Sequence, residues 1–237
     1  RQTFVWDMRH PMSPYLLAIA VGDFEVHREK CGEVLLEYYV PKYVGDAWRF
    51  SFYNTCRIMN FFSEYLGVAF PYERYAQVVV PEFIYGGMED VMFTILTDWT
   101  MHDKKAHCPY SDFPCPERED FSSDPLVAHE MAHMWYGDLA TAKDWGHIAI
   151  NESFATLIEA LWTERFKGRD DYLYEIYTNF KTYLGEYSRR YSRPIVTNLY
   201  KIPDEVFDRH AYEKGSVVLH MLRNLLGEEA FRRGLRL

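Results

Sequence analysis

Two histidines stand at a spacing that could hold a metal ion. Residues 129–133 read His-Glu-Met-Ala-His, so that His129 and His133 are four positions apart. On a helix, side chains four residues apart share a face, and both imidazoles can reach one ion. Zinc accepts histidine nitrogens. Glu130 lies beside the first ligand, where it can hydrogen-bond a zinc-bound water as the general base of a metallopeptidase.

A third ligand is needed, because catalytic zinc usually takes three protein ligands and keeps one position open. Glu152 follows His133 by nineteen residues and opens a second predicted helix. Two tight turns between the helices could bring them together in antiparallel orientation. The alternative interpretation treats His129 and His133 as surface or core histidines of a helix. The three residues together favour one zinc ion per chain.

The elements that must carry these residues can be predicted from the sequence. Asp124 and Pro125 are typical of a helix start, and this helix should run to about residue 136. The next helix should run from about residue 151 to 167 and end at Gly168. The remaining chain reads as helical in two segments, residues 170–186 and 211–226.

The first part of the chain has a different pattern. Residues 15–21 predict a buried strand, and apolar residues alternate over 24–26 and 34–40, as in half-buried strands. From about Val44 the spacing predicts one long amphipathic helix that stops at Gly67. Two short strands should follow, at residues 78–80 and 91–96. The sequence therefore predicts an α+β fold with a boundary near residue 43.

The zinc-ligand pattern resembles that of the gluzincin aminopeptidases, the family of aminopeptidase N and leukotriene hydrolase. The resemblance covers essentially the whole chain and includes four more segments, at residues 12–24, 86–90, 135–138 and 212–215. It implies a fragment of a longer protein. Residues 44–237 would form a C-terminally truncated, thermolysin-like catalytic domain, with a small sheet and a mostly helical lobe. Residues 1–43 would be the last strands of an N-terminal β-domain.

The resemblance also implies roles for particular residues. His129, His133 and Glu152 would hold zinc, and Glu130 would activate the water. Tyr212 would donate its hydroxyl to the oxyanion, whose charge grows only in the transition state. The peptide track would be lined by the segment Gly86, Gly87 and Met88, followed by Glu89 as the anchor for the free α-ammonium group of the substrate.

Three acidic residues need separate comment. Asp90 stands where the family usually has Asn, which adds a negative charge and removes an amide donor. Glu159 lies seven residues after Glu152, on the same helix face, and should accept the second ring proton of a zinc-bound histidine. Asp138 is a weaker alternative for that position.

The implied function is therefore zinc-dependent hydrolysis of the N-terminal peptide bond. A thermolysin-like endopeptidase is one alternative, although an amine anchor at Glu89 would block internal binding. A leukotriene-hydrolase-like epoxide hydrolase is another. An inactive fragment that acts as a binding module is the alternative outside the enzymes.

Composition limits the partners. The 237 residues carry 26 Lys and Arg against 35 Asp and Glu, a formal net charge of −9, which disfavours nucleic-acid binding. No apolar run approaches the roughly 18–20 residues that a membrane span needs, and no signal peptide is visible. The expected partners are a peptide with a free N-terminus and the further domains of the complete protein.

Four cysteines are too few for a disulfide-dense secreted scaffold, which favours a reduced, cytoplasmic protein. Cys108 and Cys115 lie in a Pro-rich segment that looks like an insertion relative to the family pattern. Free thiols, a disulfide and a second metal site all remain open for this pair.

Overall fold

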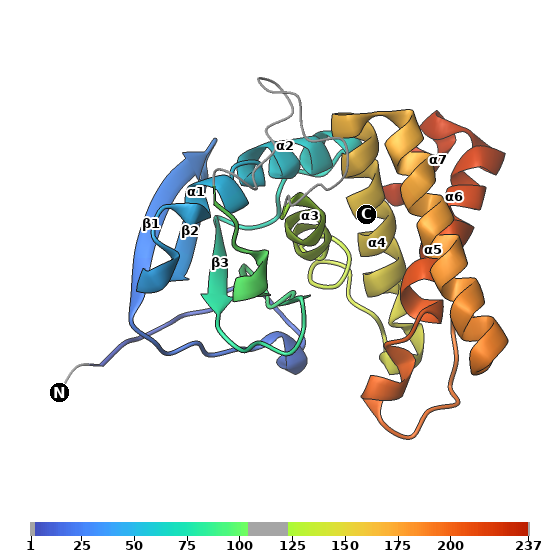
Figure 1. Ribbon diagram of the computed structural model, residues 1–237, viewed down its shortest axis with the longest axis horizontal. Helices are drawn as coiled ribbons and strands as arrows, with labels where there is room; N and C mark the ends of the chain where they lie inside the picture. Colours follow the sequence, from blue (N-terminus) through green and yellow to red (C-terminus); the bar gives the residue numbers. More distant parts are fainter. Residues whose placement is uncertain (1–2, 104–122, 237) are drawn as a thin grey trace.

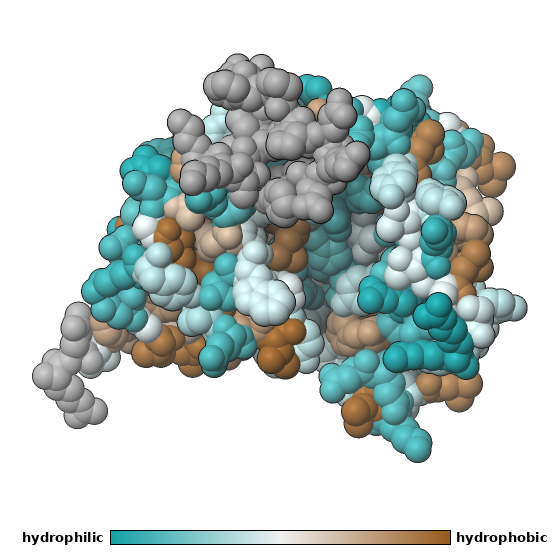
Figure 2. Space-filling view, viewed as in Figure 1, coloured by the Kyte–Doolittle hydropathy of each residue, from teal (hydrophilic) through white to brown (hydrophobic). Residues whose placement is uncertain are grey.

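A mixed sheet and a group of helices make up the two sides of the protein. The computed structural model describes residues 3–103 and 123–236. Figure 1 shows the sheet on the left, helices α4 to α7 on the right and helix α3 between them. In the space-filling view the surface is hollowed between these two sides (Figure 2). Cys108 and Cys115 lie outside the described residues, so the alternatives for them stay predictions.

Five strands form the sheet in the described part of the chain, in the order β1-β2-β3-β5-β4. β1 and β2 form an antiparallel hairpin, β2, β3 and β5 run parallel, and β4 pairs antiparallel with β5 at the edge. The strands are β1 (Phe24–Cys31), β2 (Val34–Pro41), β3 (Arg74–Val80), β4 (Gly87–Met88) and β5 (Phe93–Thr97).

The sheet continues across the boundary predicted near residue 43. The β1–β2 hairpin precedes that boundary, yet β2 pairs with β3, for example Tyr38 with Gln77. The hairpin therefore shares one hydrogen-bonded sheet with strands of the expected catalytic domain. The division into residues 1–43 and 44–237 stays a prediction.

Helices and turns account for the remaining regular structure. The helices are α1 (Ala47–Ser51), α2 (Thr55–Leu66), α3 (Asp124–Ala132), α4 (Ala149–Lys167), α5 (Arg169–Arg189), α6 (Gly215–Leu226) and α7 (Glu228–Leu235), with a π-helical turn at His210–Lys214. Short 3₁₀ turns lie at Pro14–Leu16, Lys42–Val44, Asp98–Thr100, Trp145–His147 and Pro203–Val206. The predicted α+β class is confirmed.

Three predicted helices differ in their bounds. The one expected at residues 211–226 begins as the π-helical turn His210–Lys214 and is α-helical only from Gly215. The single helix expected from Val44 to Gly67 is interrupted between α1 and α2, where the buried side chain of Asn54 donates a hydrogen bond to Asp124 (2.7 Å). The apolar spacing continues through this break, since both pieces pack against the same core. α3 ends at Ala132, four residues early, because the chain tightens there: the N–H of Met134 bonds to the carbonyl of Met131.

The strand predicted at residues 15–21 is wrong. The structure has a 3₁₀ turn at Pro14–Leu16 and irregular backbone after it. Leu17, Ile19 and Val21 are 71, 83 and 92% exposed. The apolar run of residues 15–21 imitates a buried strand, but no strand in the described ranges pairs with this segment.

The expectation of reduced cysteines is wrong for one pair. Cys31, at the end of β1, forms a disulfide with Cys56 in the first turn of α2. The bond fixes the β1–β2 hairpin to the helix that covers this side of the core. A cysteine count cannot show which residues are neighbours in space.

No helix of the described residues is both long enough and apolar enough to cross a membrane.

Candidate metal centre and active site

Helices α3 and α4 bring the three predicted metal ligands together. His129 lies on the last turn of α3, His133 directly follows that helix, and Glu152 lies on the first turn of α4. The Nε2 atoms of both histidines lie 3.4 Å from the same oxygen, Oε2 of Glu152. One candidate ligand atom from each residue lies within 4.8 Å of the others. All three atoms can therefore face a single ion.

The outer nitrogen of each histidine has its own acceptor. Nδ1 of His129 donates to Oε2 of Glu159 (3.1 Å), and Nδ1 of His133 donates to the main-chain carbonyl of Tyr136 (3.0 Å). With the protons on Nδ1, the Nε2 lone pairs point toward Glu152. Asp138 does not take this position, since neither of its buried carboxylate oxygens has a hydrogen-bond partner in the described part of the protein.

The charge balance of the cluster suits a cation. Burial alone would lower the pKa of His129, but the carboxylates of Glu152 and Glu159 raise it well above its usual value. For His133 the charges of Glu89 and Glu152 likewise outweigh burial and bring the pKa to about 9. The raised pKa values of both histidines mean that the cluster carries an excess of negative charge. A bound cation would balance this charge.

Glu152 supports the same conclusion. Burial would raise its pKa, but the charge of His133 and contacts with both imidazoles lower it to about 2, so the carboxylate stays ionised. Its Oε2 is buried and lies 3.4 Å from Nε2 of each histidine. An ionised oxygen beside two imidazoles is a donor set that fits a divalent metal, whose binding would displace the protons from the Nε2 atoms.

Glu130 and Glu89 face the same centre from two different elements. Glu130 comes from α3, and Glu89 directly follows β4; they are 5% exposed each. One candidate ligand atom from each lies within 4.8 Å of the other and of His133. Burial raises the pKa of Glu130 to about 8, although the neighbouring histidines lower it. A bound cation would lower this pKa further and favour the carboxylate.

Strand β4 approaches Glu130 closely because position 87 has no side chain. A Cβ at Gly87 would lie 2.5 Å from Cδ and 2.7 Å from Cγ of Glu130. At Gly86 a Cβ would meet only the tip of the Leu126 side chain, at 3.3 Å. Met88 is half-buried and packs against the core. The edge strand therefore brings its backbone beside the metal cluster only while residue 87 is glycine.

Asp90, the departure from the family pattern, is buried next to Glu89. Its Oδ2 has no hydrogen-bond partner among the described residues. Burial and the charge of Glu89 raise the pKa of Asp90 to about 7. The extra negative charge expected from the sequence is therefore only partly developed near neutral pH.

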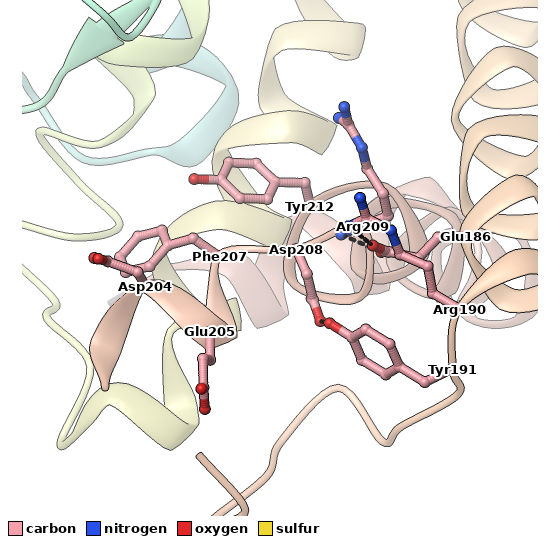
Figure 3. A pocket seen from close by; sticks show the side chains of 9 residues that line it. All are labelled: Glu186, Arg190, Tyr191, Asp204, Glu205, Phe207, Asp208, Arg209 and Tyr212. Carbon is pink, nitrogen blue, oxygen red and sulfur yellow. Dashed lines mark hydrogen bonds and ion pairs between the residues drawn. The ribbon is translucent and has the colours of Figure 1, made fainter. Parts of the chain in front are cut away.

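Tyr212 reaches the cluster from the π-helical turn. Its ring stacks near His129, with centroids 6.1 Å apart and planes 19° from parallel. Burial and the negative charges of Glu152 and Glu89 raise its pKa, so the hydroxyl keeps its proton. Tyr212 also lines a pocket of about 450 Å³ together with Asp208 and Arg209 (Figure 3). The hydroxyl can act as a hydrogen-bond donor beside the metal cluster.

Sequence reasoning missed several partners of these residues. The carbonyl of Tyr136 has no signal in the sequence, because every residue has a carbonyl group. Ser153 follows Glu152 and donates to the carbonyl of Ala211 (2.5 Å), which precedes Tyr212. The spacing of residues in two distant segments cannot reveal this contact.

Comparison with known proteins gives a consistent family match. Residues 50–237 match the model of the peptidase family M1 domain. The chain is 29% identical to "Probable aminopeptidase 2" of Sulfurisphaera tokodaii, over 95% of this chain and 28% of the relative. It is also 29% identical to "Aminopeptidase M1" of Arabidopsis thaliana (94% and 25%) and to "Leucyl aminopeptidase" of Saccharolobus solfataricus (98% and 29%). The chain spans little more than a quarter of the length of these curated relatives.

Proposed function

Because the chain belongs to peptidase family M1, we propose that it carries the active site of a zinc-dependent aminopeptidase. The observation that supports this most is the convergence of His129, His133 and Glu152 with Glu130 and Glu89 in one buried cluster. Hydrolysis of an N-terminal peptide bond needs three metal ligands, a carboxylate that acts as the base and a second carboxylate that binds the amine. The names of the relatives support a substrate with a free N-terminus.

One zinc ion would be held by His129, His133 and Glu152. When bound, it supplies a Lewis acid that polarises the scissile carbonyl and makes water more acidic. Glu159 and the carbonyl of Tyr136 fix the ring orientations of the two histidines through their Nδ1 protons.

Glu130 and Tyr212 would carry the proton transfer and the charge stabilisation. Glu130 accepts a proton from the attacking water as its oxygen bonds to the carbonyl carbon. The same carboxyl then gives that proton to the leaving amine nitrogen as the C–N bond breaks. Tyr212 donates its hydroxyl to the carbonyl oxygen, where negative charge develops in the transition state.

Strand β4 and Glu89 would orient the peptide. Among the described strands β4 pairs with β5 alone, so its other edge offers main-chain groups to an extended peptide. Gly86, Gly87 and Met88 would line this track. Glu89 lies at its end and would bind the α-ammonium group, which explains release of a single N-terminal residue.

Metal loading can be tested by elemental analysis of the complete protein. His129→Ala is expected to lose its zinc, since one of three ligands is removed. Glu159→Ala keeps all three ligands and is expected to weaken zinc affinity by about 10- to 100-fold. His220→Ala, whose ring contacts Tyr172 on α5, serves as a control and should keep its zinc. Full retention of zinc in His129→Ala would rule out this site.

The exopeptidase proposal is tested with one peptide in free and N-acetylated forms, digested by the complete protein and followed by mass spectrometry. Acetylation removes the cation and leaves Glu89 an unpaired buried carboxylate, so only the free peptide should be cleaved, one residue at a time. Glu89→Ala should lower kcat/KM for the free peptide by about 10- to 150-fold, the equivalent of about 1.5–3 kcal/mol for a charge-assisted hydrogen bond. The acetylated peptide should be affected far less.

A chelator control is run beside these digests, because metal-dependent cleavage should stop when zinc is removed. Efficient internal cleavage of the acetylated peptide would contradict the aminopeptidase proposal and support the thermolysin-like endopeptidase. Absence of any cleavage by a folded, zinc-loaded protein would support the inactive binding module.

The length of the relatives and the disulfide bond support two further proposals about the complete protein. Relatives about four times as long support further domains around this chain. The Cys31–Cys56 disulfide supports an oxidising compartment, in place of the cytoplasmic location that the cysteine count favoured.

A further inference from the structure

The π-helical turn that carries Tyr212 is held by a buried ion pair outside the metal cluster. Residues His210–Lys214 form this turn, in which the N–H of Lys214 bonds to the carbonyl of Arg209 (2.9 Å). A π turn holds one residue more than an α turn, and is frequently found at functional sites. If the π turn relaxed to an α-helix, its register would change by one residue. The side chains of the turn would then point about 100° away from their present directions. The direction of Tyr212 therefore depends on what keeps the turn in this form.

Asp208 binds the start of the turn. Its Oδ1 accepts the N–H groups of His210 (2.9 Å) and Ala211 (3.2 Å), while its main-chain carbonyl accepts the N–H of Tyr212 (3.3 Å). Its Oδ2 accepts the hydroxyl of Tyr191 (2.5 Å). Figure 3 shows this carboxylate directed at Tyr191, with the ring of Tyr212 pointing away from both.

Arg193 in turn fixes Asp208. Nε and Nη2 of the guanidinium donate to the two carboxylate oxygens at 2.8 and 2.5 Å, and the two side chains are only 10 and 8% exposed. The other three N–H groups donate to the carbonyls of Pro194, Ile195 and Val206. All five guanidinium donors are thus used, and the geometry leaves this pair little freedom.

Helix α4 contacts the turn near its start and at its end. Ser153, next to Glu152, donates to the carbonyl of Ala211. The first residue of α6, Gly215, lies so close to Ser153 that a Cβ there would overlap its side chain. Contacts at both ends therefore relate the position of Tyr212 to that of the metal ligand Glu152.

A cation site is the other interpretation of this region. Glu186, Asp208 and His210 offer ligand atoms within 4.8 Å of one another. The guanidinium of Arg193 already contacts both oxygens of Asp208, and Nε2 of His210 accepts the main-chain N–H of Arg193 (3.2 Å). Arg193 supplies the positive charge that a metal would bring, so the cluster serves the turn.

We propose that Asp208 and Arg193 are positioning residues for Tyr212, and that their buried pair holds the π-helical turn in the form that directs the tyrosine hydroxyl at the metal cluster. This inference rests on the proposed role of Tyr212 in peptide hydrolysis. Neither residue touches the substrate in this account, since both act through the backbone of the turn.

The test is a double-mutant cycle on the complete protein with Asp208→Asn and Tyr212→Phe. Asp208→Asn keeps the size of the side chain and removes the charge that Arg193 binds. It should lower kcat by about 10²-fold, as expected for a misplaced catalytic group, with little change in KM. In the Tyr212→Phe background the same substitution should have almost no further effect on kcat, because the hydroxyl it positions is already gone.

A readout besides activity is hydrogen exchange of the segment 208–215. In Asp208→Asn the amides of His210 and Ala211 should exchange faster, while zinc content stays normal. Arg223→Gln is the matched control, since it removes another buried ion pair of this lobe, that of Arg223 with Glu164 (2.6 Å). It should lower stability without changing kcat or the exchange of this segment. Arg193→Lys, which keeps the positive charge but cannot make the two parallel hydrogen bonds to Asp208, enters the same cycle if Asp208→Asn does not fold.

The outcomes separate this inference from the proposed function. Equal losses from Asp208→Asn in both backgrounds, or unchanged exchange over 208–215, would overturn the positioning role. If Tyr212→Phe itself kept normal kcat, the catalytic role of Tyr212 would be wrong, and unchanged exchange would still count against Asp208 and Arg193.

Discussion

Glu130→Gln is expected to keep its zinc and to lose turnover by at least about 10²- to 10⁴-fold, the contribution of a general acid–base group. The amide has nearly the same shape as the carboxylate but cannot accept a proton from water. Glu130 is not one of the three proposed zinc ligands, although it lies with Glu89 and His133 in an adjoining cluster, so its replacement should leave the metal in place. kcat and zinc content measured on the same preparation check both parts.

The matched control is Glu37→Gln on β2. Glu37 is as buried as Glu130, at 3 against 5% exposed, but it pairs with Arg28 and Arg74 in the sheet. Its replacement should lower the melting temperature and leave kcat nearly unchanged. A folded, zinc-loaded Glu130→Gln protein with near-normal turnover would rule out Glu130 as the base.

Tyr212→Phe is expected to lower kcat by about 10²- to 10³-fold, the cost of removing one donor to an oxyanion, with little change in KM. The donor matters only when negative charge has developed on the carbonyl oxygen, so substrate binding should be almost unaffected. Burial and nearby carboxylates keep this hydroxyl protonated, which suits a donor at any pH where the enzyme works.

Tyr172→Phe provides the comparison for Tyr212→Phe. Tyr172 is fully buried on α5 and its hydroxyl bonds to Nδ1 of His220 (2.7 Å), remote from the metal ligands in sequence and contacts. The Tyr172→Phe protein should be less stable than the unaltered protein and should have the same kcat. A rise in KM alone for Tyr212→Phe would make Tyr212 a binding residue and remove its transition-state role.

The proximity of the three proposed metal ligands could be predicted because the pattern behind it is local. His129 and His133 lie four residues apart, and the helix that aligns them is predicted by Asp124 and Pro125. Glu152 required only that two consecutive helices pack together, as α3 and α4 do. The contact of Glu159 with His129 could be predicted because Glu159 lies two helical turns after Glu152, on the same face of the helix.

Features set by tertiary contacts could not be predicted in this way. The apolar residues 15–21 have no partner strand in the part of the chain that the structure describes, which no local pattern can show. The π turn at Tyr212 depends on Arg193, about twenty residues earlier in the chain. The contact between Gly87 and Glu130 joins an edge strand to a helix across the site, and only the structure reveals why that glycine is needed.

The Cys31–Cys56 bond has a practical consequence for anyone who produces this protein. It closes a loop of 25 residues, for which the chain-entropy account gives about 3.5 kcal/mol of stabilisation. That is a large part of the 5–15 kcal/mol by which a typical domain is stable. Expression in a reducing bacterial cytosol, or purification with thiol reagents, would remove this contribution. An export pathway with oxidative folding, and buffers without reductant, are therefore the appropriate starting conditions for every variant compared above.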